Sequence, residues 1–183
     1  MQFDIKISKS NFQQLLLIPA ILLLTACATP KQESIVDLSL PGFVRTPENL
    51  RVIDSRADKS LYLVHFVKDQ SIPWKLNTVP GIEIALTRHI GAEGSERIKG
   101  KQVLVAIESV ELKAEVRAFT SAIPQGCQIE SRVTVDGIVA PRLVSTFVPS
   151  DGTIWSTTPT QGRQILHGCL KAHAREIALT VGQ

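Results

Sequence analysis

"KQVLVAIESVELKAEVRAF", residues 101 to 119, is the stretch that decides the fold, because it carries the clearest strand pattern of the chain. Apolar residues occupy every second position from Val103 to Ile107, and from Val110 onward they occupy the opposite parity. Successive side chains of a strand point to opposite faces of a sheet. The change of parity therefore predicts a long strand with a bulge or bend near Glu108 and Ser109.

Three neighbouring stretches extend this strand into a sheet. In "CQIESRVTVDG", residues 127 to 137, apolar and polar residues alternate, which is typical of an antiparallel strand with one face in the core and one in water. "RLVSTFV", residues 142 to 148, is predicted to be its partner. Earlier in the chain, "LRVIDSR" (50–56) and "LYLVHFV" (61–67) are short β-rich runs, and "ADKS" between them has the length of a hairpin connection.

Two segments have helical signals. Residues 78–94 begin with Thr78 as a plausible N-cap and Pro80 in the first turn, and the glycines at 91 and 94 are predicted to end that helix. Residues 158–181 carry an apolar stripe at helical spacing that includes Cys169 and His173. The order ββαβββα predicts an α+β fold, in which two helices pack on one face of an antiparallel sheet of four to five strands.

The chain before this domain is predicted to be an export signal and a tether. Residues 1 to 11 are basic, and the apolar run "LLLIPAILLL" that follows has about half the roughly 20 residues that a membrane-spanning helix needs. Residues 28–48 hold three prolines and little periodicity, which favours a tether that lifts the domain off a bilayer. We therefore expect a signal peptide over 1–26, a tether over 27–48 and a single domain over 49–183.

The end of the export signal resembles the lipobox of bacterial lipoproteins in "LTAC", Leu24 to Cys27. The resemblance implies cleavage before Cys27, a diacylglyceryl thioether on its sulfur and acylation of the new amino group. An ordinary signal peptide cut at an A-x-A-like site is the alternative. Two or more acyl chains hold a protein stably on a membrane. Ala28 follows the cysteine, and by the sorting rule of enterobacterial lipoproteins the absence of Asp there favours the outer membrane over the inner one.

Charge and composition exclude one class of partner. The net charge is +3, and residues 1–26 hold two Lys and one Asp, so the mature chain carries +2. Lys and Arg are scattered among Asp and Glu as on an ordinary soluble surface, and they form no basic stripe. We therefore expect no nucleic-acid partner.

The other two cysteines, Cys127 and Cys169, are predicted to form a disulfide, because the periplasm is oxidising and an even pair in an exported chain favours one. Both fall on apolar faces of their predicted elements. The alternatives are free thiols, or a metal site that includes the His167, Cys169 and His173 of "HGCLKAH". On a helix, however, His167 and His173 point well away from each other, and a closed zinc site needs four converging ligands.

The chain carries no nucleophile elbow, phosphate loop or dinucleotide fingerprint, so we expect no cofactor. His89 and His173 both project onto apolar helix faces and could meet in space, although buried, hydrogen-bonded imidazoles are the favoured interpretation. His65 and His167 are expected at the solvent edge. Trp74 and Trp155 either form an exposed recognition pair or, as we favour, plug the ends of a small core.

"VIDSRADKS", residues 52–60, places Asp54 and Arg56 at a strand end. It resembles the V-x-D-x-R opening of small Gram-negative envelope lipoproteins, both the YajG-type family and the auxiliary lipoproteins of lipid-transport systems. The resemblance implies similar domain order and makes Asp54 and Arg56 candidate partner-binding residues. An ion pair that pins the strand end to a turn is the alternative, worth roughly 0–1 kcal/mol if exposed.

These features predict an outer-membrane lipoprotein that acts non-catalytically, as an adaptor or stabilising subunit of an envelope complex. Its partners would be the membrane, through lipid on Cys27, and another envelope protein that binds a sheet edge or an exposed strand face. One alternative is a binder of lipid or another hydrophobic ligand between helices and sheet. The other is a periplasmic metal-dependent enzyme built on His89, His173 and the two thiols.

Overall fold

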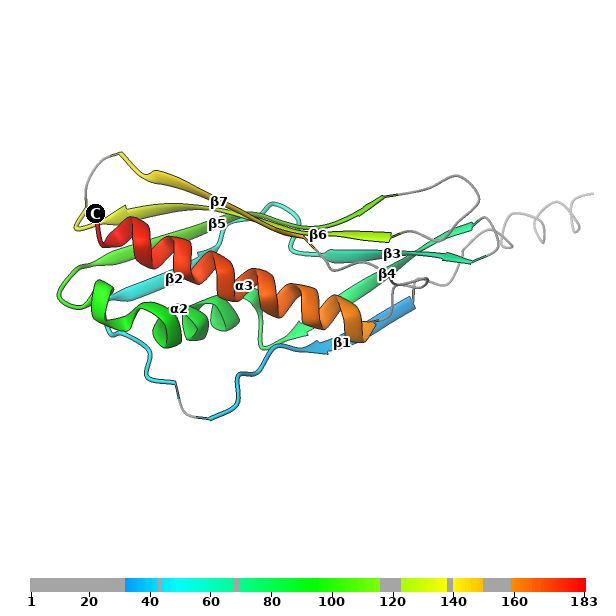
Figure 1. The fold of residues 1–183 in the computed structure, drawn as a ribbon, viewed down its shortest axis with the longest axis horizontal. Coiled ribbons are helices and arrows are strands. Elements are labelled where there is room, and N and C mark those ends of the chain that lie inside the picture. Colours follow the sequence, from blue (N-terminus) through cyan, green and yellow to red (C-terminus); the bar gives the residue numbers. More distant parts are fainter. Residues whose placement is uncertain (1–31, 43, 68–69, 116–122, 138–139, 150–158) are drawn as a thin grey trace, which may run out of the picture. The chain divides into compact units, whose positions relative to one another are not determined.

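The computed structural model describes residues 32–42, 44–67, 70–115, 123–137, 140–149 and 159–183. Together they form an α+β fold of two sheets and two helices (Figure 1), which confirms the predicted class. The strands and helices are β1 (Gln32–Asp37), β2 (Leu50–Asp54), β3 (Leu61–Val67), β4 (Gln70–Val79), α2 (Ile82–Ile98), β5 (Val103–Glu115), β6 (Ile123–Val135), β7 (Arg142–Pro149) and α3 (Pro159–Val181).

The four-stranded sheet has the order β2-β5-β6-β7. The predicted antiparallel neighbours β5, β6 and β7 are confirmed, and so is the bulge, since the register of β5 against β6 shifts between Ile107 and Ser109. The prediction of a wholly antiparallel sheet was wrong, because β2 pairs with β5 in parallel.

The second sheet was not predicted. It has the order β1-β4-β3, with β1 parallel to β4 and β3 antiparallel to it. The predicted hairpin of residues 50–56 with 61–67 was therefore wrong, because β2 and β3 belong to different sheets. Strand β4 carries Pro73, a residue that argues against a central strand. Pro73 lies one residue before the stretch that pairs with β1, which begins at Trp74.

The compact unit begins at Lys31, before the predicted domain start at residue 49. Strand β1 lies inside the segment predicted to be a tether, and its apolar residues anchor it: Val36 is 1% exposed and Leu38 is fully buried. The prolines of this segment suggested an unstructured tether, but a short parallel strand needs only a few apolar contacts to be held in place.

Helix α2 begins and ends four residues later than predicted. Thr78 belongs to β4, the peptide bond between Val79 and Pro80 is cis, and Gly81 is the N-cap. Both glycines that were expected to end the helix lie inside it at close approaches. A Cβ at Gly91 would lie 2.8 Å from the backbone oxygen of Arg45, and a Cβ at Gly94 would overlap that of Ala178 on α3.

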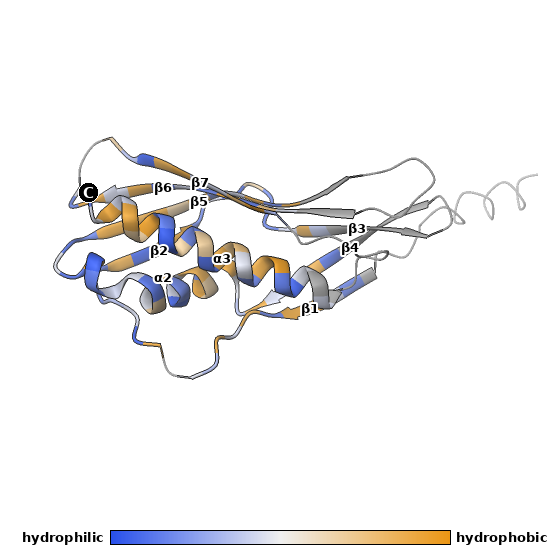
Figure 2. Cartoon of the chain, in the orientation of Figure 1, coloured by the Kyte–Doolittle hydropathy of each residue, from blue (hydrophilic) through white to orange (hydrophobic). Residues whose placement is uncertain are grey.

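The core lies between the two helices and one face of the four-stranded sheet, and it extends to Val36, Leu61 and Leu76 of the three-stranded sheet. Alternate residues of β5 and β6 are buried in this core, as are residues of α3 at helical spacing. Helix α3 runs alongside these strands in Figure 1, and Figure 2 shows hydrophobic residues, in orange, recurring along it. The C-terminal carbonyls of α3 accept hydrogen bonds from cationic groups, with Lys101 bonded to Val181 and Arg142 Nη1 3.0 Å from the Thr180 oxygen. Cations near the C-terminal end of a helix stabilise it, because that end carries the negative pole of the helix dipole.

Candidate functional site

The predicted lipidation residue Cys27 and the tryptophan at 155 lie outside the described residues. Trp74 lies on β4, where its register partners are Leu63 on β3 and Gln32 on β1. Within the described ranges, no helix is both long and apolar enough to cross a bilayer.

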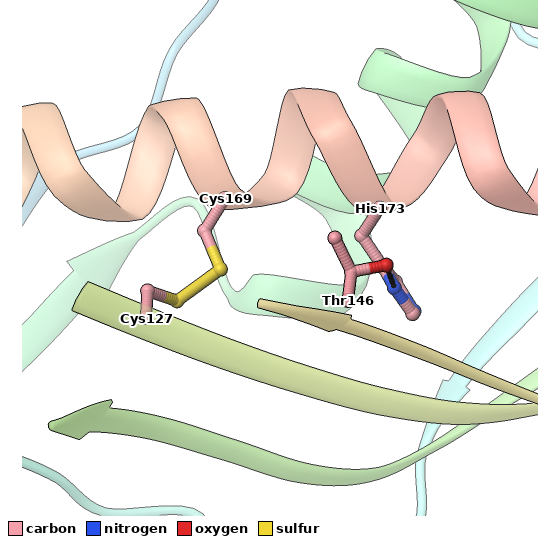
Figure 3. Close-up of a disulfide and its surroundings, with 4 residues drawn as sticks. All are labelled: Cys127, Thr146, Cys169 and His173. Atoms are coloured by element: carbon pink, nitrogen blue, oxygen red, sulfur yellow. Dashed lines mark hydrogen bonds between the residues drawn. A yellow bond between two sulfur atoms is a disulfide. The ribbon is translucent and has the colours of Figure 1, made fainter. Parts of the chain in front are cut away.

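The disulfide between Cys127 and Cys169 is confirmed (Figure 3). It joins β6 to α3 across the core, with the two Cα atoms 5.9 Å apart and both residues fully buried. Two independent periodicities, of the strand and of the helix, point the two cysteines toward each other. The bond closes a loop of 42 residues, which in the chain-entropy treatment stabilises the fold by about 4 kcal/mol.

One turn further along α3, His173 forms a buried polar cluster with the sheet. Its Nε2 lies 2.9 Å from Ser131 Oγ on β6. Its Nδ1 lies 2.8 Å from Thr146 Oγ1 on β7, the contact drawn in Figure 3. Burial lowers the pKa of His173 to about 4, so the ring is neutral at neutral pH. The two hydroxyls can satisfy both nitrogens of a neutral imidazole, one as donor and one as acceptor.

This cluster has the residue types of a Ser–His pair but not the access that a nucleophile needs. Ser131 and His173 are fully buried and Thr146 is 8% exposed, so a substrate has no route to the hydroxyl. The role of the cluster is therefore structural, since its two hydrogen bonds fix the position of α3 against β6 and β7. The prediction of a buried, hydrogen-bonded imidazole is confirmed for His173.

From the sequence alone His89 could meet His173, but its ring packs against a different histidine. Its ring instead lies edge-on to His167 of α3, with the ring centroids 5.7 Å apart. Burial, with a smaller effect from His167, lowers the pKa of His89 to about 4, and Glu93 opposes the shift. Nearby, the Arg175 guanidinium donates to the Glu93 carboxylate over 2.6 Å and holds its pKa below the ordinary value.

These histidines form no metal cluster with other ligands in the part of the chain that the structure describes, where no group of three or more His, Cys, Asp and Glu could hold an ion. Cys127 and Cys169 are bonded to each other, so neither offers a thiolate. The residues proposed for a metal-dependent enzyme are thus divided among a disulfide, a buried hydroxyl cluster and a histidine pair.

Asp54 and Arg56 form a buried ion pair at the end of β2. The guanidinium donates from Nε to Asp54 Oδ1 over 2.9 Å and from Nη2 to Oδ2 over 2.8 Å, and Nη2 also reaches the Lys59 carbonyl over 3.2 Å. Burial would raise the pKa of Asp54, but these hydrogen bonds outweigh it and hold the pKa below its ordinary value. The side chains are only 5% and 6% exposed. This geometry supports the interpretation that the Asp54–Arg56 ion pair holds the end of β2 against the following turn. The two side chains leave little exposed surface that a partner protein could contact.

A hollow of about 630 Å³ lies between residues 44–49 and the second half of α2. Asn49 lines it and donates from Nδ2 to the Ile98 carbonyl over 3.2 Å. Its walls include side chains of both charges, Arg45, Glu48, Glu96 and Lys99. The space between the helices and the four-stranded sheet, where a hydrophobic ligand was considered, is occupied by buried core side chains.

The side of the four-stranded sheet that points away from α2 and α3, termed here the outward face, exposes large apolar side chains. Leu143 and Phe147 on β7 are 63% and 51% exposed, and Leu104 on β5 is 37% exposed. On the neighbouring strand β6, Glu130 lies opposite Ser145 and therefore between the levels of Leu143 and Phe147. Its carboxylate accepts hydrogen bonds from Ser145 Oγ over 3.2 Å and from Gln128 Nε2 over 2.9 Å.

Sequence reasoning missed these residues, although one signal was available. In "RLVSTFV" apolar residues occupy both parities, with Val144 and Val148 on one face and Leu143 and Phe147 on the other. A strand with one face in water needs only one apolar set. The second set therefore predicts large apolar side chains on the face of β7 that points away from the core.

Comparison of the chain with protein-family models, with curated proteins and with solved structures finds no match.

Proposed function

We propose that this protein is a lipoprotein of the bacterial envelope that acts non-catalytically, as an adaptor or stabilising subunit that docks another envelope protein on its outward face. The observation that carries the proposal is the exposure of Leu104, Leu143 and Phe147 on that face. Exposed apolar patches rimmed by polar residues mark interaction sites.

The arrangement of the outward face suits a protein partner. The register places Arg132 of β6 between Leu143 of β7 and Ala106 of β5, so two apolar side chains flank an arginine in this row. Arg132 is neutralised by Glu108, with Nε and Oε1 2.7 Å apart. Glu130 remains between the two exposed apolar side chains of β7. An amphipathic segment with apolar side chains and a central basic residue would match this pattern.

Anchoring supports the same proposal. The lipobox-like "LTAC" implies acyl chains on Cys27, and Ala28 favours the periplasmic face of the outer membrane, with the inner membrane as the less favoured site. A protein held on a membrane needs little affinity to find a partner in the same envelope, because tethering raises the effective concentration. The disulfide fits an oxidising compartment.

Site-specific photocross-linking in living cells tests the docking surface. A photoreactive amino acid is placed at Phe147 or at Leu104, and at Ile84 as the matched control, which is 46% exposed but lies on α2. We expect both outward-face positions to capture the same envelope protein and Ile84 to capture none. Products that contain only lipid or only this chain, or equal capture from Ile84, would contradict the proposal.

A further inference from the structure

Strand β7 lies at one end of the four-stranded sheet. β7 is the last strand of the order β2-β5-β6-β7, so among the described residues one of its long sides pairs with no strand. Proteins blunt such edges with bulges, charged side chains or prolines. The register of β7 against β6 runs without a bulge from Val133↔Arg142 to Gly126↔Pro149.

The charged side chain on this edge already has a hydrogen-bond partner within the same chain. Arg142 is the charged residue of β7, and its guanidinium donates to the Thr180 carbonyl at the end of α3. The prolines stand only at the ends, at 141 and 149. Seven consecutive residues between them, 142–148, retain their backbone N–H groups, so the middle of the edge is available for pairing.

This stretch is symmetric about Ser145. In an antiparallel pair of two β7 strands centred on Ser145, Leu143 of one copy lies opposite Phe147 of the other, and Val144 lies opposite Thr146. The two prolines also face each other, at the point where neither copy has an N–H to donate. Residues that lie opposite in an antiparallel pair share a face and a hydrogen-bonding type, so this register suits either set of free backbone groups.

We propose that the protein self-associates through β7, with two copies related by a two-fold axis at Ser145 and their four-stranded sheets joined into one. The joined sheet brings the exposed Leu143 and Phe147 side chains into two cross-strand apolar pairs, which partly cover them. The two outward faces become one continuous surface. The inference goes beyond the proposed function, since two copies can pair whether or not an envelope partner binds.

Cross-linking at the axis tests the proposal on the full chain in membranes. Opposed Cα atoms of an antiparallel pair are about 4.5–5.5 Å apart, within the span of a disulfide. Ser145→Cys should therefore yield a disulfide-linked product of twice the chain mass on a non-reducing gel after mild oxidation. Ser95→Cys, exposed on α2, is the matched control and should yield none.

Charge exchange across the axis tests the register. Adding L143K to the Ser145→Cys chain places a charge opposite Phe147 in both pairs and should reduce the cross-linked fraction about tenfold. Adding F147E as well should restore it, because the new side chains of opposite charge lie opposite each other. A chain that keeps wild-type thermal stability but gives no Ser145→Cys product would overturn the proposal, as would equal cross-linking of Ser95→Cys or no rescue by F147E. Cross-linking of Ser145→Cys to a different protein would assign the edge to another occupant and also overturn it.

Discussion

Acidification should destabilise the protein through His173, and the magnitude follows from its burial. The ring is fully buried between Ser131 and Thr146, and its pKa falls from the ordinary 6.5 to about 4. The unfolded chain therefore binds a proton on this histidine over a pH range in which the folded chain does not. Linkage requires stability to fall as pH drops below 6.5 and to level off below 4.

The size of this loss can be stated for a given pH. A shift of one pKa unit corresponds to about 1.4 kcal/mol, so the shift of His173 is worth about 3 kcal/mol in full and about 2.5 kcal/mol by pH 4.5. His89, with its pKa also lowered to about 4, adds a loss of the same sign. Isolating the contribution of His173 therefore requires a variant that leaves His89 in place.

His173→Gln provides that comparison, because the amide can still bond the two hydroxyls but does not titrate. Urea unfolding at several pH values between 8 and 4.5 gives the free energy of unfolding of both proteins, and equal m-values check that the same surface unfolds. The wild type should lose about 2.5 kcal/mol more than the variant over this range. Parallel pH profiles for the two proteins would refute the burial of an uncharged His173.

Three further predictions concern packing and pairing, and denaturant midpoints measure all of them. Gly94→Ala should destabilise by about 1–3 kcal/mol because the new methyl overlaps α3, whereas Gly168→Ala, with nothing within 4 Å, should stabilise by about 0.4–1 kcal/mol; equal effects would contradict the close helix approach. Arg56→Met should cost about 3–5 kcal/mol by leaving the Asp54 carboxylate buried and unpaired, and adding Asp54→Leu should recover most of it; additive losses would contradict the buried pair. Replacing both cysteines of the disulfide by alanine should cost about 4 kcal/mol, and a loss below about 1 kcal/mol would contradict its loop-closing role.

The features that sequence reasoning predicted correctly are those that follow from the spacing of apolar residues within a single strand or helix. The alternation around Cys127 and the helical stripe through Cys169 each orient one residue toward the core, and the structure joins the two. The bulge beside Ser109 is likewise visible as a change of parity within one strand.

The features that were missed depend on contacts between distant segments. The parallel pairing of β2 with β5 joins Leu50 to Val103, and no local pattern specifies such a partner. Gly91 and Gly94 resemble a helix stop in the sequence, but their role is set by Arg45 and Ala178, which approach from elsewhere in the chain. The outward face was missed because exposure follows from the position of the helices.

The proposed function depends first on the lipid at Cys27, and one measurement tests that directly. It is the intact mass of the non-reduced protein purified from membranes, combined with a count of free thiols. The account predicts a chain that begins at Cys27, carries the mass of two or three acyl chains and has no free thiol, since Cys127 and Cys169 are bonded. A chain that retains residues 1–26, or that is cleaved elsewhere without added lipid, would contradict the envelope-anchored adaptor.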